Sequence, residues 1–273
     1  SEVDYPLLRE MHAASTLVEP AEVGQWRAGA GLPKSAPPGG LLPLPAPNER
    51  SGRSLGETIL RRASTRQFAR VPISAEELSS VLFHATRGFP ADVPSGLVDL
   101  YLVLNAVGGY EPGAYCYRPG AHRLERLKTG EFRREAGHLC LEQALGSDAS
   151  AVIFFLADLT AILRGFGNRG YRLANLEAGI VGGRSYLGAY ALGFGASGMT
   201  FYDKDVVSFF SPHAEQKDAL FVTALGRSVK GTPSTVVPLQ IATPQIDFMT
   251  ARECFSVPVR PERAILESDF PTA

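Results

Sequence analysis

Cysteine is scarce in this chain of 273 residues. Its three cysteines, Cys116, Cys140 and Cys254, are widely separated, with no C-x-x-C pair and no Cys/His spacing typical of zinc ligands. A disulfide-held secreted domain pairs its cysteines, and a structural zinc site needs several thiolate or imidazole ligands at short spacing. The sequence therefore predicts neither a disulfide framework nor a metal site, and it favours the reducing cytoplasm as the setting.

An excess of charge and a long apolar run are also lacking. Lysine and arginine number 27 against 28 acidic residues, for a net charge of -1, so no global field attracts nucleic acid or an anionic membrane. No run approaches the roughly 18 apolar residues of a membrane-spanning helix, and the N-terminal segment does not resemble a signal peptide. We therefore expect a small, weakly charged partner, and neither a nucleic-acid nor a membrane partner.

Proline and glycine divide the chain into three parts. Residues 29–47, "GAGLPKSAPPGGLLPLPAP", are rich in both and predict an extended connector. The segment before it, around "DYPLLREMHAAST", predicts a short helix that lies either on the main domain or on a partner subunit. The predicted organisation is an arm and connector over 1–48, a central domain over 49–231 and a proline-rich tail over 232–273, which could wrap a partner subunit.

The central domain alternates helical and strand patterns. Ser74 with Glu77 three residues later is a capping box that opens an amphipathic helix, and a further helix is expected from Ser54. Strands are predicted over 97–105, 114–117, 122–127, 151–156 and 218–226, and a long, mostly buried helix over 171–192. The run "AVIFFL" at 151–156 is typical of a central strand buried on both faces. We predict an α+β fold with a central, mostly antiparallel sheet flanked by helices.

Two glycine runs match the G-x-G-x-x-G pattern of dinucleotide-binding loops. Gly165, Gly167 and Gly170 form the first, and "GFGASG" at 193–198 forms the second. The fingerprint requires a strand that leads directly into the glycines. The helical segment "DLTAILR" precedes the first run and the long helix precedes the second, so neither predicts a Rossmann site.

The stretch "ILRRASTRQFARVPISAEELSSVLFHATRG", residues 59–88, resembles the opening of the FMN-dependent nitroreductase superfamily. On this resemblance Arg62, Ser64 and Arg66 match flavin-contacting positions. Guanidinium groups spaced around a hydroxyl can surround a phosphate and a ribityl chain with donors. The alternative for the cluster alone is a solvated basic helix end.

A second stretch, "LEAGIVGGRSYLGAYALGFGASGMTFYD" at 176–203, is similar to the long central helix of that superfamily and the loop that follows it over the flavin. The alternative is a glycine-rich turn that ends a helix. The resemblance implies cofactor contacts from Ser95, in a shortened "PSG" loop, and from Arg227, in "ALGRS". It also implies contacts from the loop residues Gly198, Met199, Thr200 and Phe201.

Three further motifs, "HAAS", "NRGYRLANLEAG" and "VGGYEPGAYCYRPGAHRLERL", resemble the SagB-type dehydrogenase branch. That resemblance implies an intertwined homodimer with two FMN sites at the subunit interface. It implies oxidation of azoline heterocycles in a peptide natural product to azoles, with dioxygen as the electron acceptor. It further implies a peptide or small heterocyclic substrate and cyclodehydratase-type partner proteins.

The sequence departs from the branch where a base is expected. Gly165 and Phe166 stand at the positions of a Lys-Tyr pair, and neither side chain can take up a proton. The candidate replacements are Tyr171, Tyr202 and His84, although residues of this kind beside a buried helix are more often structural than catalytic. In the long helix, Gly183 and Arg184 replace a common Gln-Asn. Two alternatives therefore stay open: an NAD(P)H-dependent reductase of nitroreductase type, and a non-catalytic flavin-binding or scaffold subunit of a peptide-modifying complex.

Overall fold

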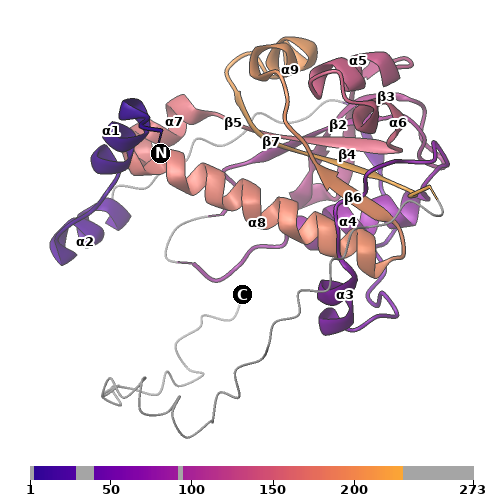
Figure 1. Cartoon of the computed structure of the whole chain (residues 1–273), viewed down its shortest axis with the longest axis horizontal. Coiled ribbons are helices and arrows are strands. Elements are labelled where there is room, and N and C mark those ends of the chain that lie inside the picture. Colours follow the sequence, from indigo (N-terminus) through magenta and orange to yellow (C-terminus); the bar gives the residue numbers. More distant parts are fainter. Residues whose placement is uncertain (1–2, 29–39, 92–94, 230–273) are drawn as a thin grey trace, which may run out of the picture. The chain divides into compact units, whose positions relative to one another are not determined.

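The computed structural model describes residues 3–28, 40–91 and 95–229 (Figure 1). The predicted tail, Cys254 and residues 29–39 of the connector lie outside these ranges. Within them, seven strands form one antiparallel sheet in the order β1-β4-β3-β2-β5-β7-β6. The strands are β1 (Leu41–Pro43), β2 (Asp99–Leu104), β3 (Gly113–Arg118), β4 (Arg123–Thr129), β5 (Ala151–Ala157), β6 (Gly195–Gly198) and β7 (Asp218–Gly226).

Helices cover both faces of this sheet. They are α1 (Pro6–Ala14), α2 (Pro20–Ala28), α3 (Leu55–Arg61), α4 (Ala75–Thr86), α5 (Arg133–Leu139), α6 (Ala144–Asp148), α7 (Leu159–Phe166), α8 (Arg169–Ala191) and α9 (Asp203–Phe210). Helices α4 and α8 lie on one face, while α5, α6 and α9 lie on the other (Figure 1). The predicted α+β fold with a helix-flanked antiparallel sheet is confirmed.

Strand β5 lies in the middle of the core, as its continuous apolar run predicts. Ile153 and Phe155 point toward the α4 and α8 layer, and Val152 and Phe154 point toward the α5 and α9 layer. All are fully buried. Because successive side chains of a strand point to opposite faces, a strand covered on both sides must be apolar throughout.

The predicted helix starts are confirmed in detail. The Ser74 hydroxyl accepts the Glu77 backbone N–H, and the Glu77 carboxylate accepts the Ser74 backbone N–H, which completes the capping box of α4. Ser54 caps α3 by accepting the Glu57 N–H. These caps fix where α3 and α4 begin and therefore where the residues between them lie.

Helix α8 has the predicted length but not the predicted burial. Its buried stripe consists mostly of small residues, among them Ala174, Ala178 and Gly182. A Cβ on Gly182 would stand 2.5 Å from the ring of Phe221, so the small residues let the helix approach the sheet closely. Leu176, predicted to be inward, is 59% exposed. The prediction of a mostly buried helix is therefore wrong for Leu176, whereas Val181 and Tyr186 are buried.

Two segments predicted to be irregular form edge strands instead. Leu41–Pro43, in the proline-rich connector, pairs with β4 as strand β1. Gly195–Gly198, expected as part of a loop, pairs with β7 as strand β6. A Cβ on Gly195 would meet the Thr65 hydroxyl at 2.0 Å, so glycine here serves close packing of two backbone segments. The loop of the second motif therefore begins only after Gly198.

No helix in the described ranges combines the length and the apolar character needed to cross a membrane. Cys116 and Cys140 are buried thiols, and burial raises the pKa of each to about 12. Both therefore remain protonated and unreactive at neutral pH.

Candidate functional site

The basic segment after α3 is held against the edge of the sheet. The Thr65 N–H donates to the Ala196 carbonyl of β6 at 2.9 Å, and the Ala69 N–H donates to the Arg227 carbonyl at 2.8 Å. The Val229 N–H donates to the Gln67 carbonyl at 3.1 Å. Residues 65–69 thus run along the ends of β6 and β7, which gives the polar side chains around them a fixed backbone.

The three predicted phosphate and ribityl contacts keep their donors available. Arg62 lies with its guanidinium 5.5 Å from the centre of the Tyr186 ring. Within the described ranges, neither it nor Arg66 pairs with a carboxylate, and the half-buried Ser64 hydroxyl has no hydrogen-bond partner. The adjacent Arg61, in contrast, forms an ion pair with Glu57 at 3.1 Å. An anion placed beside this cluster would meet donors that no protein group uses.

The second motif reaches the same place. The Tyr186 hydroxyl, under the Arg62 guanidinium, accepts a hydrogen bond from the Gly198 N–H. Gln143 donates to the Thr200 hydroxyl at 3.2 Å, and Gln143 and Arg66 line one hollow of about 420 Å³. The structure therefore brings together two motifs that are about 130 residues apart in the sequence.

The loop after β6 presents only part of what the sequence predicts. Met199 is buried and Phe201 is half-buried, and both pack in the core between the sheet and α9. Thr200 is exposed beside Gln143. A bound ligand can thus reach Gly198, the Thr200 hydroxyl and the backbone of the loop. The side chains of Met199 and Phe201 hold the loop by packing in the core.

Arg227 already has an anionic partner. Its Nη2 donates to both carboxylate oxygens of Glu77, at 2.7 and 2.8 Å, and its guanidinium lies 5.7 Å from the Phe194 ring. Since Glu77 also completes the capping box of α4, this ion pair ties the end of β7 to that helix. A phosphate at Arg227 would have to share it with Glu77.

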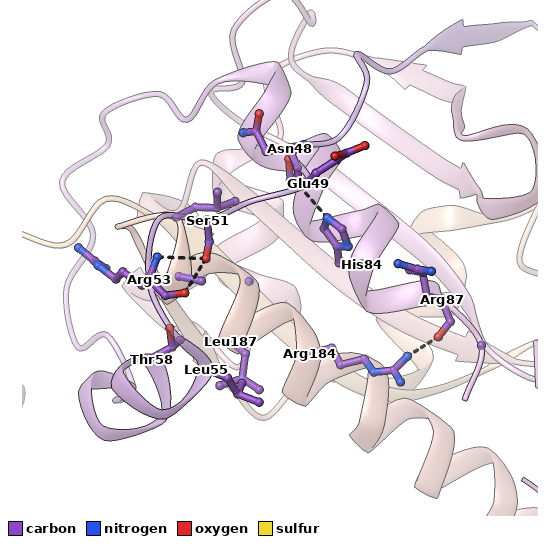
Figure 2. Close-up of a pocket in the computed structure, with 15 residues that line it drawn as sticks. Asn48, Glu49, Ser51, Arg53, Leu55, Thr58, His84, Arg87, Arg184 and Leu187 are labelled. Atoms are coloured by element: carbon purple, nitrogen blue, oxygen red, sulfur yellow. Dashed lines mark hydrogen bonds between the residues drawn. The ribbon is translucent and has the colours of Figure 1, made fainter. Parts of the chain in front are cut away.

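A second hollow, a cleft of about 590 Å³, opens between α3, α4, α8 and the segment 48–53 (Figure 2). His84 lies in its wall, and its Nε2 donates to the Asn48 carbonyl at 2.8 Å. A carbonyl can only accept, so Nε2 carries a proton and Nδ1 is the acceptor of the neutral ring. Ser95 lies beside this cleft, with its hydroxyl 3.5 Å from where a Cβ on Gly88 would stand.

A buried carboxylate holds the Ser95 loop, and the sequence prediction missed it. Glu177 is 6% exposed, and its Oε1 accepts the N–H groups of Gly96 and Leu97 at 2.9 and 3.0 Å. Burial raises the pKa of the Glu177 carboxyl, against the lowering effect of these hydrogen bonds. The signal was present in the quoted "EAG" of the long helix, but the partner of the carboxylate could not be read from the sequence.

The three candidate catalytic residues are not brought together. Tyr171 lies on α8 thirteen residues before Arg184 of the cleft, about 20 Å along a helix. Tyr202 lies on the other face of the sheet, with its ring 5.3 Å from that of His138. Of the three, His84 lines the larger of the hollows described here.

Phe166, at the second position of the expected Lys-Tyr pair, is a buried residue of the core. Phe166 is 2% exposed, and its ring lies 5.9 Å from that of Trp26 in the N-terminal arm. The Trp26 indole N–H donates to the Phe166 carbonyl at 2.9 Å. Arg172 donates to the Ser15 hydroxyl at 2.6 Å and to the His12 carbonyl at 2.8 Å. The arm therefore docks on α7 and α8 of its own chain.

Cys116, Glu125 and His213 form a cluster with potential metal-ligand atoms within 4.8 Å of one another. Arg118 lies among them, with Nη2 2.5 Å from Glu125 and 3.0 Å from His213 Nε2. A guanidinium thus stands where a cation would bind, and the Cys116 thiol is protonated. The cluster combines β3, β4 and the segment after α9, which a search for spaced motifs does not detect.

Residues 59–227 match the model described as the nitroreductase family, and these residues contain both flavin-side motifs and most of the sheet. The chain belongs to the nitroreductase family. A relative from Methanocaldococcus jannaschii that is named as a nitroreductase is 30% identical over 161 residues, which cover 56% of this chain and 81% of the relative. The resemblance is thereby confirmed at the level of the family and of an oxidoreductase.

Several solved structures share the fold. A chain from Anabaena variabilis named as a nitroreductase has a TM-score of 0.61 and 32% identity, covering 64% of this chain but only 38% of the Anabaena chain. One from Ralstonia eutropha has a TM-score of 0.58 at 24% identity, covering 71% and 98%. The Escherichia coli microcin synthetase McbBCD complex, with truncated pro-MccB17 bound, has a TM-score of 0.54 at 15% identity, covering 82% and 92%. The last two show the fold alone.

Proposed function

We propose that this nitroreductase-family chain is an FMN-dependent oxidoreductase of the SagB-type branch that oxidises azoline heterocycles of a peptide to azoles. The observation that carries the proposal is the cluster of Arg62, Ser64 and Arg66. Its donors have no anionic partner within the described ranges, and it lies beside the loop of the second motif.

The donor chemistry of the cluster fits FMN. Arg62, Ser64 and Arg66 would hold the phosphate and ribityl chain, since two guanidinium groups and a hydroxyl match their oxygens. The Gly198 and Thr200 segment, linked to the cluster through Tyr186 and Gln143, would border the flavin ring. When bound, FMN supplies a hydride acceptor at the substrate carbon.

The position of the arm supports the branch. His12 and Ser15 of "HAAS" contact Arg172 of "NRGYRLANLEAG", so two of the motifs that resemble SagB-type dehydrogenases form one interface. A microcin synthetase complex with a bound peptide precursor is among the structures that share the fold, which is compatible with a peptide substrate and partner proteins.

The proton that leaves with the hydride needs a base, and of the three candidates His84 is the one that lines the described cleft. Its ring faces the 590 Å³ cleft, and Nδ1 is the nitrogen not engaged by Asn48. The need for a base distinguishes this reaction from that of a second candidate function. An NAD(P)H-dependent reductase needs no base, because water supplies protons to a reduced substrate. The apolar packing of Phe166 where the branch has a Lys-Tyr pair supports this alternative.

We also propose a homodimer in which a second copy covers Ile59 and Leu60 of α3 and Leu176 of α8. Leu60 is 80% exposed, and Ile59 and Leu176 are each more than half exposed. A partner subunit would remove these aliphatic side chains from water, which favours association. Analytical ultracentrifugation, with Leu60→Glu as the disrupting variant, tests the proposal.

Titration of the purified protein with FMN tests the cofactor. We expect saturable binding with quenching of flavin fluorescence, and a protein that fails to bind FMN at any concentration would refute the proposal. For the holoprotein, loss of two hydrogen atoms from an azoline peptide, followed by mass spectrometry, supports the dehydrogenase. Anaerobic bleaching by NADPH without that loss supports the reductase, and neither reaction in a flavin-loaded protein indicates the non-catalytic subunit.

A further inference from the structure

The lining of the cleft between α3, α4 and α8 carries an excess of positive charge. Arg53, Arg87 and Arg184 line it, against one acidic residue, Glu49. Three positive charges against one negative leave two positive charges in excess. Arg87 and Arg184 lie together at one end of the cleft, where a carbonyl of one residue and the guanidinium of the other are in contact (Figure 2).

The partners of these guanidinium groups are neutral. Arg53 donates to the Tyr190 carbonyl at 2.5 Å, and Arg184 donates to the Arg87 carbonyl. The Arg87 and Arg184 guanidinium groups also lie 5.9 and 5.8 Å from the rings of Phe83 and Phe89. None of the three forms an ion pair within the described ranges. Carbonyls and rings orient a guanidinium without neutralising it, so its charge stays available to an anion.

The cleft also has an apolar part, and its frame is fixed. The exposed Leu55 of α3 and the half-buried Leu187, one turn after Arg184 on α8, contribute aliphatic surface to the cleft (Figure 2). The segment that closes it is fastened to α4 by the hydrogen bonds of Asn48 with Ser80 and with His84, both at 2.8 Å. A volume of about 590 Å³ is within the range of about 300–1,000 Å³ of small-molecule sites. The cleft is thus large enough, pre-formed and amphipathic.

We propose that this cleft binds a small organic carboxylate with an apolar body. The guanidinium groups of Arg87 and Arg184 take the carboxylate, and Leu55 and Leu187 contact the body. Planar guanidinium groups match a planar carboxylate, and two of them at one end of an apolar groove select for an acid over its amide. Assigning this acid as part of the substrate rests on the proposed function. The binding itself does not, because Arg62, Ser64 and Arg66 do not line the cleft.

Binding of N-benzoylglycine and of its neutral amide to the full chain tests the proposal, measured by calorimetry and by protein-observed NMR without added FMN. We expect the acid to bind at least about tenfold more tightly than the amide, as one charge-assisted contact provides. Arg184→Gln and, separately, Arg87→Gln should each reduce this ratio about tenfold. Arg50→Gln, an exposed arginine next to the cleft that does not line it, should leave the ratio unchanged.

Equal affinity for acid and amide, absence of binding by the acid, or an unchanged ratio in both cleft variants would overturn the proposal. Tighter binding of 2′-AMP than of the acid in the same cleft would assign the cleft to a phosphate ligand. That result would also overturn the carboxylate proposal. A parallel FMN titration separates this result from the cofactor proposal: loss of the acid preference with FMN binding intact refutes only the cleft. An acid preference without FMN binding refutes only the flavoenzyme.

Discussion

The basic cluster after α3 and the junction of α7 with α8 differ in what their side chains do. The superfamily resemblance predicts cofactor contacts at the cluster, and the branch resemblance predicts a base at the junction. At the cluster, Arg66 and Ser64 have no protein partner within the described ranges, and Arg62 lies over an aromatic ring. At the junction, Phe166 is buried against Trp26, and the side chains in place of the Lys-Tyr pair carry no titratable group.

The difference teaches how a binding position and a packing position can be told apart. Polar donors left unused next to a hollow cost nothing while they are solvated, and they become strong contacts when an anion arrives. A ring that is fully packed contributes to folding instead, since its removal leaves a cavity. We therefore expect variants at the cluster to change ligand affinity with little effect on stability, and variants at the junction to do the reverse.

Phe166→Ala should have the largest effect on folding. The variant removes a buried ring between α7 and the arm, for which we expect a loss of about 3–5 kcal/mol in the free energy of unfolding. Chemical denaturation of the wild type and the variant measures it, with Leu163→Ala on the more exposed side of the same helix as control. A loss below about 1 kcal/mol, or lost FMN affinity in a stable variant, would show that Phe166 belongs to a ligand site and would break the comparison.

Arg66→Ala tests the other half of the comparison. Removing one charge-assisted contact to a phosphate should weaken FMN binding by about 1.5–3 kcal/mol, roughly tenfold to a hundredfold. Fluorescence titration measures the affinity, and unfolding should change by less than about 0.5 kcal/mol because the side chain is exposed. Arg61→Ala is the matched control, since its guanidinium is paired with Glu57. Equal losses in the two variants would mean that only general charge matters.

Local patterns predicted most of the fold because they act within a few residues. Neighbours along the chain determine the Ser74 capping box, the length of α8 and the strand β5, which is buried on both faces. The edge strands β1 and β6 could not be predicted, because proline and glycine there are tolerated only through pairing with a strand far away in the sequence. The exposure of Leu176 on α8 could not be predicted, because the buried stripe of this helix consists mostly of small residues.

For the candidate site, the sequence predicts which residue types are present but not which groups their side chains contact. Arg62, Ser64 and Arg66 are predicted from a contiguous motif. The structure places Arg66 in one hollow with Gln143, which contacts Thr200, and Arg62 over the Tyr186 ring. The engagement of Arg227 by Glu77 and of His84 by Asn48 depends on tertiary contacts. Glu177 was overlooked because an acidic residue on a helix normally faces water, whereas this one is buried and accepts two backbone N–H groups.

Substitution of Glu177 should have an intermediate effect on the free energy of unfolding, and this effect should depend on pH. Because its pKa is raised in the folded state, the native protein binds this proton more tightly than the unfolded chain. Its contribution to the free energy of unfolding therefore falls as the pH rises from below 4.5 through the raised pKa. Glu177→Gln keeps an acceptor oxygen for Gly96 and Leu97 but cannot titrate, so this pH dependence should vanish.

Glu177→Ala should cost about 1–3 kcal/mol at neutral pH by leaving two backbone donors without an acceptor. Urea denaturation across the pH range measures both variants, and hydrogen exchange at Gly96 and Leu97 reports the loop directly. A pH profile of Glu177→Gln that matches the wild type would show that another group titrates. Unchanged exchange in Glu177→Ala would show that the Ser95 loop does not depend on this carboxylate.

Arg172→Ala should have the smallest effect, and it tests whether the junction owes its packing to the arm of its own chain. The variant loses hydrogen bonds to the Ser15 hydroxyl and the His12 carbonyl, worth about 0.5–1.5 kcal/mol for undocking of the arm. Hydrogen exchange should then rise in α1 and α2 while exchange in β5 stays unchanged. Arg164→Ala, on the exposed side of α7, is the control. Because docking within one chain does not depend on concentration, protection of the arm that grows with protein concentration would instead assign its binding surface to a second copy.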